Sequence, residues 1–541
     1  MRSLVLLAVA AVGLFILNSC AGHGPYRIAD SGCDSVINLG VGNSEKAYGD
    51  QARLSCMLQT HSLVSAYHLP ASHRGVPIEP DQFRLAFVEL DPKISQDVRD
   101  KQLNAAVGSL SGAGQNYVVA FVHGWRHNAE IGDSDIGKLR TMLAYTRSFL
   151  NIRCVELGRY CNARLTGIYL GWRGASFVEP GGDRTVVGTI GAGPTFWARK
   201  GESERLKDAA LKVLKTVESN LNLRAGDFEA DKMLVVGHSF GGNMLANAFK
   251  DRIIDAVNKH EMGAYFEAPV GDLTVMINPA SEASNWTAIQ EAVAKKAGRS
   301  IVVGGPLGDQ FERVFSKGQR PNYLAITSAC DWADEEIKGV EGSIRSVQCD
   351  QPTGYLFPMG QAAALKWDRE RMTTIGHLNP IYVADPTSSS GASLQNGTRR
   401  VGTTHEFITN KFAEDTSIRF ASDPKLSRCD VADGWLSQVQ ARMGGGGRHW
   451  DSAYKGPNRD NILWVDQARG IFAQFRHSLS LPGFASGQLA SIAPANSPFW
   501  NVRAFDTAIA NHGGYVGYPL WCSLNQLVLD DVVANHRVPP S

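Results

Sequence analysis

The segment that most constrains the fold runs from Lys232 to Lys250 and reads KMLVVGHSFGGNMLANAFK. Its apolar, β-branched start predicts a buried strand, and small and apolar residues at helical spacing from Asn243 onward predict a helix. The residues GHSFGG join the two without a spacer, so the turn between them must be sharp. In such a turn a Cβ at Gly237 or Gly241 would collide with neighbouring backbone. The segment therefore predicts a strand, a tight turn and a helix, with Ser239 raised at the apex.

The rest of the chain predicts alternating strands and helices. Strands are expected at 84–90, 117–122, 165–172, 273–280, 323–328 and 499–505, and helices at 135–151, 202–220, 242–258, 285–296 and 521–533. The strand at 84–90 is expected at an antiparallel edge, whereas the apolar run at 117–122 is typical of a parallel strand buried on both faces. Helices between parallel strands fit right-handed crossover connections. The fold class is therefore α/β, with a mostly parallel central sheet and helices on both faces.

A serine in the pattern G-x-S-x-G between a strand and a helix forms a nucleophile elbow, and here the chain resembles the α/β-hydrolase family of esterases, lipases and peptidases. The resemblance implies that Ser239 is the nucleophile. It also implies that the strand ending in His123-Gly124 supplies one half of an oxyanion hole. The backbone N–H groups of Trp125 and Phe240 would be the two donors, aimed at the oxygen on which negative charge develops.

The same resemblance places the triad acid just after the penultimate predicted strand, where the sequence has Asp331 and Asp334. Asp331 comes first and is the preferred acid, with Asp334 as the alternative; either carboxylate could instead cap a helix or face solvent in a turn. The general base is expected between the last strand and the terminal helix, which gives His512, with His377 as its rival. The order serine, acid, histidine along the chain is the order typical of this fold.

No metal or other cofactor is expected. His123 and His127 could be read as a metal pair, but they lie where a strand runs into a loop rather than on one face of a helix. The H-E-x-x-H motif of zinc hydrolases does not accompany them. We therefore interpret this stretch as part of the oxyanion loop.

The chain is long enough, at 541 residues, for one large domain with insertions. The core of the fold is predicted at 83–334 and 496–541, and the resemblance itself covers roughly 84–331 and 496–534. Residues 21–82 form an N-terminal lead segment in this interpretation. Residues 335–495 form a long insertion, which in hydrolases commonly folds as a cap over the pocket.

The N-terminus predicts export. Residues 1–20 carry an early arginine and a short apolar run, as signal peptides do, and they end in a sequence that resembles the bacterial lipobox. Cys20 is then the lipidated residue and the membrane anchor, and Ala21 after it favours the outer membrane, facing the periplasm or the cell surface. An ordinary secretory signal cleaved nearby is the alternative. The net charge is +1 with lysines and arginines spread out, so no nucleic-acid partner is expected.

Cysteine usage agrees with export, because eight cysteines remain after Cys20 and an even number in an oxidising compartment favours disulfides. The sequence alone leaves their connectivity open, and buried free thiols are the alternative. Nearest-neighbour pairing would join Cys33 with Cys56, Cys154 with Cys161, Cys330 with Cys349, and Cys429 with Cys522.

Taken together, the sequence predicts an exported serine hydrolase that cleaves an ester through an acyl-enzyme. The expected substrate is a small-molecule or lipid ester, or an acylated component of the cell envelope. A peptidase or thioesterase of the same fold is one alternative, because fold does not fix chemistry. A non-catalytic envelope lipoprotein that uses a hydrolase scaffold for binding is the other. The sequence gives no indication of the oligomeric state.

Overall fold

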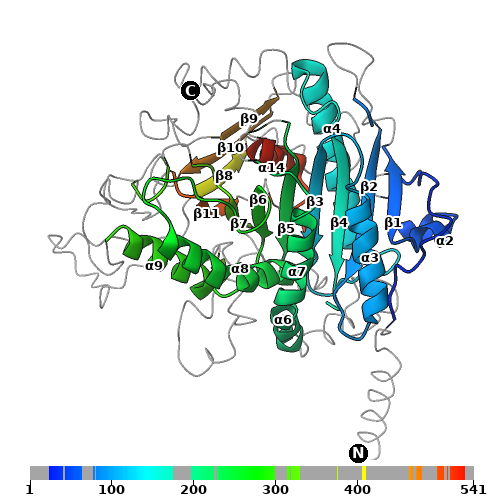
Figure 1. Cartoon of the computed structure of the whole chain (residues 1–541), viewed down its shortest axis with the longest axis horizontal. Helices are drawn as coiled ribbons and strands as arrows, with labels where there is room; N and C mark the ends of the chain where they lie inside the picture. The colour runs from blue at the N-terminus through cyan, green and yellow to red at the C-terminus, as the bar shows by residue number, and fades with distance from the viewer. Residues whose placement is uncertain are drawn as a thin grey trace, which may run out of the picture.

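The computed structural model forms an α/β protein in which helices surround one long sheet (Figure 1). It describes residues 24–40, 43–63, 77–79, 81–174, 196–224, 227, 229–298, 313–316, 319–328, 374–375, 405–409, 462–466, 471–477, 496–504, 509 and 512–529.

The sheet has 11 strands within these residues, in the order β1-β2-β4-β3-β5-β6-β7-β11-β8-β10-β9. All neighbours from β2 to β8 in this order pair in parallel, while β1, β10 and β9 are antiparallel additions at the two edges. The strands are β1 Leu58–Ser62, β2 Gln82–Glu89, β3 Asn116–Val122, β4 Arg164–Gly171, β5 Lys232–His238, β6 Leu273–Ile277, β7 Tyr323–Ser328, β8 His405–Thr409, β9 Ile462–Asp466, β10 Ile471–His477 and β11 Phe499–Ala504. The predicted mostly parallel sheet is confirmed.

The edge of the sheet differs from the prediction. β2 is not an edge strand, because it pairs in parallel with β4 on one side and antiparallel with β1 on the other. The edge is β1, which lies in the predicted lead segment, so the sheet begins before residue 82. β1 is only five residues long and its burial alternates, so its sequence lacks the continuous apolar run that marks the central strands.

The other end of the sheet also extends further than predicted. β8, β9 and β10 belong to the range 335–495 and continue the sheet beyond β11. Most of that range lies outside the described residues, so its role as a cap stays a prediction.

Different helices cover the two faces of the sheet (Figure 1). The elements are η1 Glu45–Ala47, α2 Gln51–Leu54, α3 Gln96–Gly108, α4 Ser134–Leu157, α6 Phe196–Arg205, α7 Lys207–Glu218, α8 Phe240–Lys259, α9 Ser284–Lys296 and α14 Tyr518–Leu529. Helices α4 and α14 pack on one face, and α3, α6, α7, α8 and α9 form the layer on the other. The helix predicted at 202–220 is divided between α6 and α7 at Leu206, whose side chain is buried in the core.

The strand β3 shows why the central sheet is stable. Every residue of β3 is buried, and alternate side chains enter the two hydrophobic cores on opposite faces. Each large apolar side chain buried in this way contributes about 1.5–3 kcal/mol. A continuous apolar run is therefore what a strand covered on both faces requires, as predicted. Tyr117, Val119 and Phe121 enter one core, and Val118, Ala120 and Val122 enter the other.

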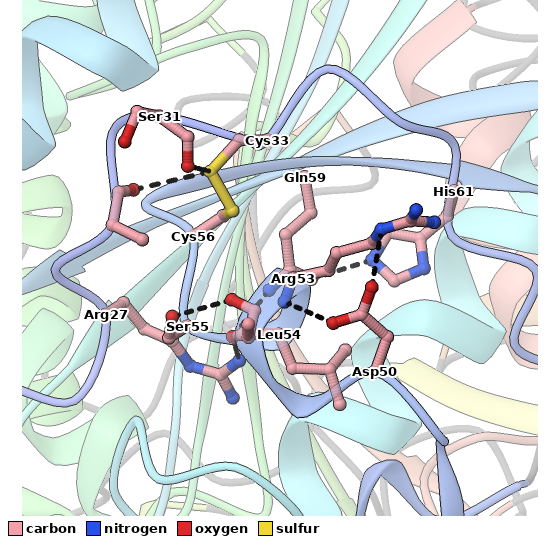
Figure 2. The surroundings of a disulfide bond; sticks show 12 residues. Arg27, Ser31, Cys33, Asp50, Arg53, Leu54, Ser55, Cys56, Gln59 and His61 are labelled. Carbon is pink, nitrogen blue, oxygen red and sulfur yellow. Dashed lines mark hydrogen bonds and ion pairs between the residues drawn. A yellow bond between two sulfur atoms is a disulfide. The ribbon is translucent and has the colours of Figure 1, made fainter.

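The N-terminal segment is fastened to the sheet by a buried arginine and a disulfide (Figure 2). The guanidinium of Arg27 lies 4.3 Å from the centre of the Phe87 ring and donates to the carbonyl oxygens of Ala129 and Leu54. Its Nη2 lies 3.0 Å from a carboxylate oxygen of Glu45, and both side chains are almost fully buried. A buried charge needs such a partner, so Glu45 stabilises the arginine whose contacts with Phe87 and Ala129 fix the segment to the fold.

The disulfides confirm part of the predicted pairing. Cys33 is bonded to Cys56, and Cys154 to Cys161. Cys522 is also disulfide-bonded. Its predicted partner Cys429, and the predicted pair Cys330 and Cys349, lie outside the described residues.

Candidate active site

Ser239 lies at a strained turn between β5 and α8. Its backbone has φ 54° and ψ −116°, a conformation that residues with a Cβ rarely adopt. The flanking glycines make the turn possible, since a Cβ on Gly241 would overlap the carbonyl oxygens of Val122 and His123. A Cβ on Gly237 would lie 2.7 Å from the carbonyl oxygen of Gly241. The predicted strand, turn and helix are therefore present, for the predicted steric reason.

The structure brings His512 to Ser239. The two side chains are hydrogen-bonded, with 2.8 Å between Nε2 of His512 and Oγ of Ser239. His512 lies in the segment between β11 and α14, at the edge of the sheet where the parallel strands end. Two of the three residues predicted for the triad are therefore in direct contact.

The two residues predicted as oxyanion donors lie just after the ends of two neighbouring strands. Trp125 follows the end of β3 and Phe240 begins α8 directly after β5, and β3 and β5 pair in parallel. The end of β3 packs closely on the elbow, because a Cβ on Gly124 would lie 3.0 Å from Cβ of Ser239. The N–H of Phe240 belongs to the first turn of a 20-residue helix, where N–H groups lack intrahelical acceptors and the helix dipole is positive.

Aromatic rings surround these two positions. The ring of Phe196, at the start of α6, lies 4.9 Å from the ring of Phe240 and 5.2 Å from that of Trp125. Trp125 and Phe240 are 6.0 Å apart, measured between ring centres. The three rings therefore pack together as part of the hydrophobic core on this face of the sheet.

His123 has a structural role. It is fully buried, and its ring stacks between those of Tyr169 and Trp172, at 5.2 and 5.5 Å. Its Nε2 accepts a hydrogen bond from the backbone N–H of Trp172. Its Nδ1 lies 2.9 Å from the carbonyl oxygen of Gly124, to which it donates. Burial lowers the pKa of His123 to about 4, so the ring is neutral near pH 7. It holds the loop after β3 in place.

A buried charged cluster lies behind the elbow. His127 has Nδ1 3.1 Å from Asp133 and Nε2 3.4 Å from Asp135. Burial alone lowers the pKa of His127, but the two carboxylates outweigh it and raise the pKa to about 9. Asp135 is fully buried and accepts hydrogen bonds from Tyr515 and Lys138; burial raises its pKa, but the charges of His127 and Lys138 hold it well below the usual range.

Sequence reasoning assigned no role to His238 or Asn278. Both side chains contact the backbone carbonyl oxygen of His512, at 2.8 Å each. They come from the carboxyl ends of β5 and β6. The available signal was their position, because polar residues at the ends of adjacent parallel strands meet at one edge of a sheet.

Other predicted site residues lie outside the described residues. These are the candidate acids Asp331 and Asp334, the alternative base His377 and the lipidation site Cys20. In the described part of the chain, His, Cys, Asp and Glu side chains form no group of three or more suited to hold a metal ion. None of the described helices has the length and apolar character needed to cross a bilayer.

Comparison of the chain with models of protein families, with curated proteins and with solved structures gives no match.

Proposed function

We propose that this protein is a serine hydrolase of the α/β-hydrolase type that cleaves an ester through an acyl-enzyme. The observation that carries the proposal is the 2.8 Å hydrogen bond between His512 Nε2 and Ser239 Oγ, on a serine at a strained turn between a strand and a helix. A serine hydroxyl is a weak nucleophile near neutral pH and needs an adjacent base. The pair supplies both groups.

The chemistry begins with attack of Ser239 Oγ on the ester carbonyl carbon. His512 takes the hydroxyl proton at Nε2 during the attack and returns it to the leaving alcohol as the tetrahedral intermediate collapses. The serine is then acylated. A water molecule attacks the acyl-enzyme in the same way, with His512 first accepting its proton and then giving it back to Ser239 Oγ, which releases the carboxylic acid.

Negative charge on the substrate oxygen would be stabilised by the backbone N–H groups of Trp125 and Phe240. This role is supported by the close packing of Gly124 on Ser239, which brings the end of β3 to the elbow. One such donor is worth about 2.7–4 kcal/mol of transition-state stabilisation in a hydrolase.

Asp331 is the proposed acid of the triad, with Asp334 as the alternative. The acid would orient the imidazole of His512 and stabilise its charged form. Both candidates follow β7, which is the strand beside β11, and β11 leads to His512. Neighbouring parallel strands thus support placing the acid and the base side by side.

The proposed substrates are esters of lipids or of acylated envelope components, and Cys20 is the proposed lipid anchor at the outer membrane. The anchor is tested by labelling cells that express the full chain with radioactive palmitate. Wild-type protein incorporates label and C20S does not; equal labelling of both excludes lipidation at Cys20.

The hydrolase proposal is tested with a fluorescent fluorophosphonate, which reacts with activated serines. The purified wild-type protein should be labelled once per chain, whereas S239A and H512A should not be labelled. H61L serves as a matched control, because His61 is buried on the distant edge strand β1. An unlabelled wild-type protein, or labelling that survives in S239A, excludes a nucleophilic Ser239.

A further inference from the structure

We infer that His238 and Asn278 are positioning residues for the general base, which hold the backbone of His512 so that its imidazole faces Ser239. The inference rests on the proposed hydrolase function. The two polar side chains stand at the ends of β5 and β6. In the proposed reaction neither of them attacks the substrate or transfers a proton.

Both side chains converge on one atom. His238 Nε2 and Asn278 Nδ2 each lie 2.8 Å from the carbonyl oxygen of His512. A carbonyl oxygen has two lone pairs, so these two donors satisfy it fully. Since one donor comes from β5 and the other from β6, the position of the His512 backbone is defined relative to the same sheet edge that carries Ser239.

The amide of Asn278 is itself fixed at both ends. Its Oδ1 accepts a hydrogen bond from the backbone N–H of Ser328, at 2.8 Å, so Nδ2 must face His512. Asn278 is fully buried and has a positive φ of 45°, which is uncommon for a residue other than glycine. Ser328 adds a second attachment, because its Oγ donates to the carbonyl oxygen of Ile509 in the same segment.

The ring of His238 is held just as firmly. Its centre lies 4.2 Å from that of the Tyr515 ring, and Tyr515 in turn donates to Asp135. Nδ1 of His238 lies 3.7 Å from Asp135, while Nε2 faces the carbonyl oxygen and therefore carries the proton. Burial lowers the pKa of His238 to about 4, so near pH 7 the ring is a neutral donor.

The consequence for catalysis is geometric. The carbonyl group of His512 is adjacent to the Cα that bears the imidazole, so a shift of the carbonyl moves Nε2 relative to Ser239. Loss of about 1 Å of alignment costs on the order of 100-fold in rate. Because both donors are directed at the backbone of His512, their removal should lower kcat and leave KM nearly unchanged.

The experiment compares H238L, H238Q and N278D with the wild type on p-nitrophenyl acetate. H238L removes the donor, whereas the amide nitrogen of glutamine can take the place of Nε2. N278D retains the acceptor for Ser328 and a side chain that tolerates positive φ, but it loses the donor. We expect kcat to fall roughly 10–100-fold in H238L and N278D with KM within about twofold, and H238Q to recover most of the loss.

A readout that does not depend on turnover is amide hydrogen exchange of residues 512–516, which should be faster in H238L and N278D than in the wild type. The buried control H61L, on β1, should exchange in this segment as the wild type does and keep kcat within about twofold. The melting temperature of each variant is measured beside that of the wild type. A loss of kcat in a variant that is still folded at the assay temperature is then attributed to positioning.

The possible results distinguish failure of the positioning roles from failure of the proposed hydrolase function. If the wild type is active and H238L and N278D match it in kcat and in exchange, the positioning roles are wrong and the hydrolase proposal stands. If H238Q is as impaired as H238L, the donated hydrogen bond is not what matters, and the inference for His238 is wrong. A wild type that neither turns over the ester nor reacts with fluorophosphonate overturns the proposed function and the inference together.

Discussion

His512 Nε2 lies 2.8 Å from Ser239 Oγ, although 273 positions separate the two residues along the chain. Ser239 is placed by the local turn after β5, whereas His512 is placed by the segment that follows β11. Proton transfer between them needs both placements at once. The pair should therefore act as a unit rather than as two independent contributors.

Non-additive loss of activity tests this unit. S239A and H512A should each lower kcat for an ester by at least about 10⁴-fold, and the double variant should be no worse than either one, because each change alone disables nucleophilic attack. Steady-state kinetics of the three variants measure the effect. Losses that multiply in the double variant would contradict a shared step.

Gly241 should be irreplaceable for steric reasons. In G241A the new Cβ overlaps backbone oxygens of Val122 and His123, which cannot move without disturbing β3. We expect a loss of about 3 kcal/mol or more in the free energy of unfolding, measured by urea denaturation. The matched control is G201A in helix α6, where a Cβ meets nothing within 4 Å. It should gain about 0.5–1 kcal/mol, and equal losses in both variants would refute the steric argument.

His127 should make the free energy of unfolding depend on pH in the alkaline range. Its pKa is raised to about 9 in the folded protein and is about 6.5 when unfolded. The stability due to this shift is therefore fully present below pH 6.5 and is lost as pH rises through 9. It amounts to about 3 kcal/mol. Urea denaturation of the wild type and H127Q should show a difference that shrinks by about this amount between pH 6 and pH 10; a constant difference would contradict it.

The two disulfides whose cysteines both lie among the described residues should stabilise the fold to different extents. Cys33 and Cys56 are 23 positions apart, whereas Cys154 and Cys161 are only 7 apart. In the chain-entropy model the longer loop is worth about 3 kcal/mol and the shorter about 2 kcal/mol. Urea denaturation of the double variants C33S/C56S and C154S/C161S measures both. A larger loss for the second pair would show that loop entropy does not govern their contributions.

The elbow was predictable because its requirements are local. A strand, a sharp turn and a helix within 19 residues leave no room for a Cβ at Gly237, which would meet the backbone of Gly241. The clash at Gly241 also involves the neighbouring strand, because a Cβ there would overlap the carbonyl oxygens of Val122 and His123. The central strands were predictable for a related reason, since burial on both faces demands a continuous apolar run such as that of β3.

The strands near the two ends of the sheet were harder to predict. β1 has an alternating burial pattern over five residues, and β8, β9 and β10 are short segments within a long insertion. Their place in the sheet depends on pairing with strands that are distant in sequence, such as β8 with β11. Periodicity within a segment carries no information about such partners, which is why β2 was mistaken for the edge.

The amino-acid sequence by itself determined the mostly parallel α/β sheet, the turn that raises Ser239, and His512 as the base candidate. Only the tertiary structure decided that His238 and Asn278 meet on the His512 carbonyl oxygen and that His127 lies between two carboxylates. The physical reason is that periodicity and backbone sterics act over a few neighbouring residues. Hydrogen bonds and ion pairs between distant segments arise only when the sheet brings its strand ends to one edge.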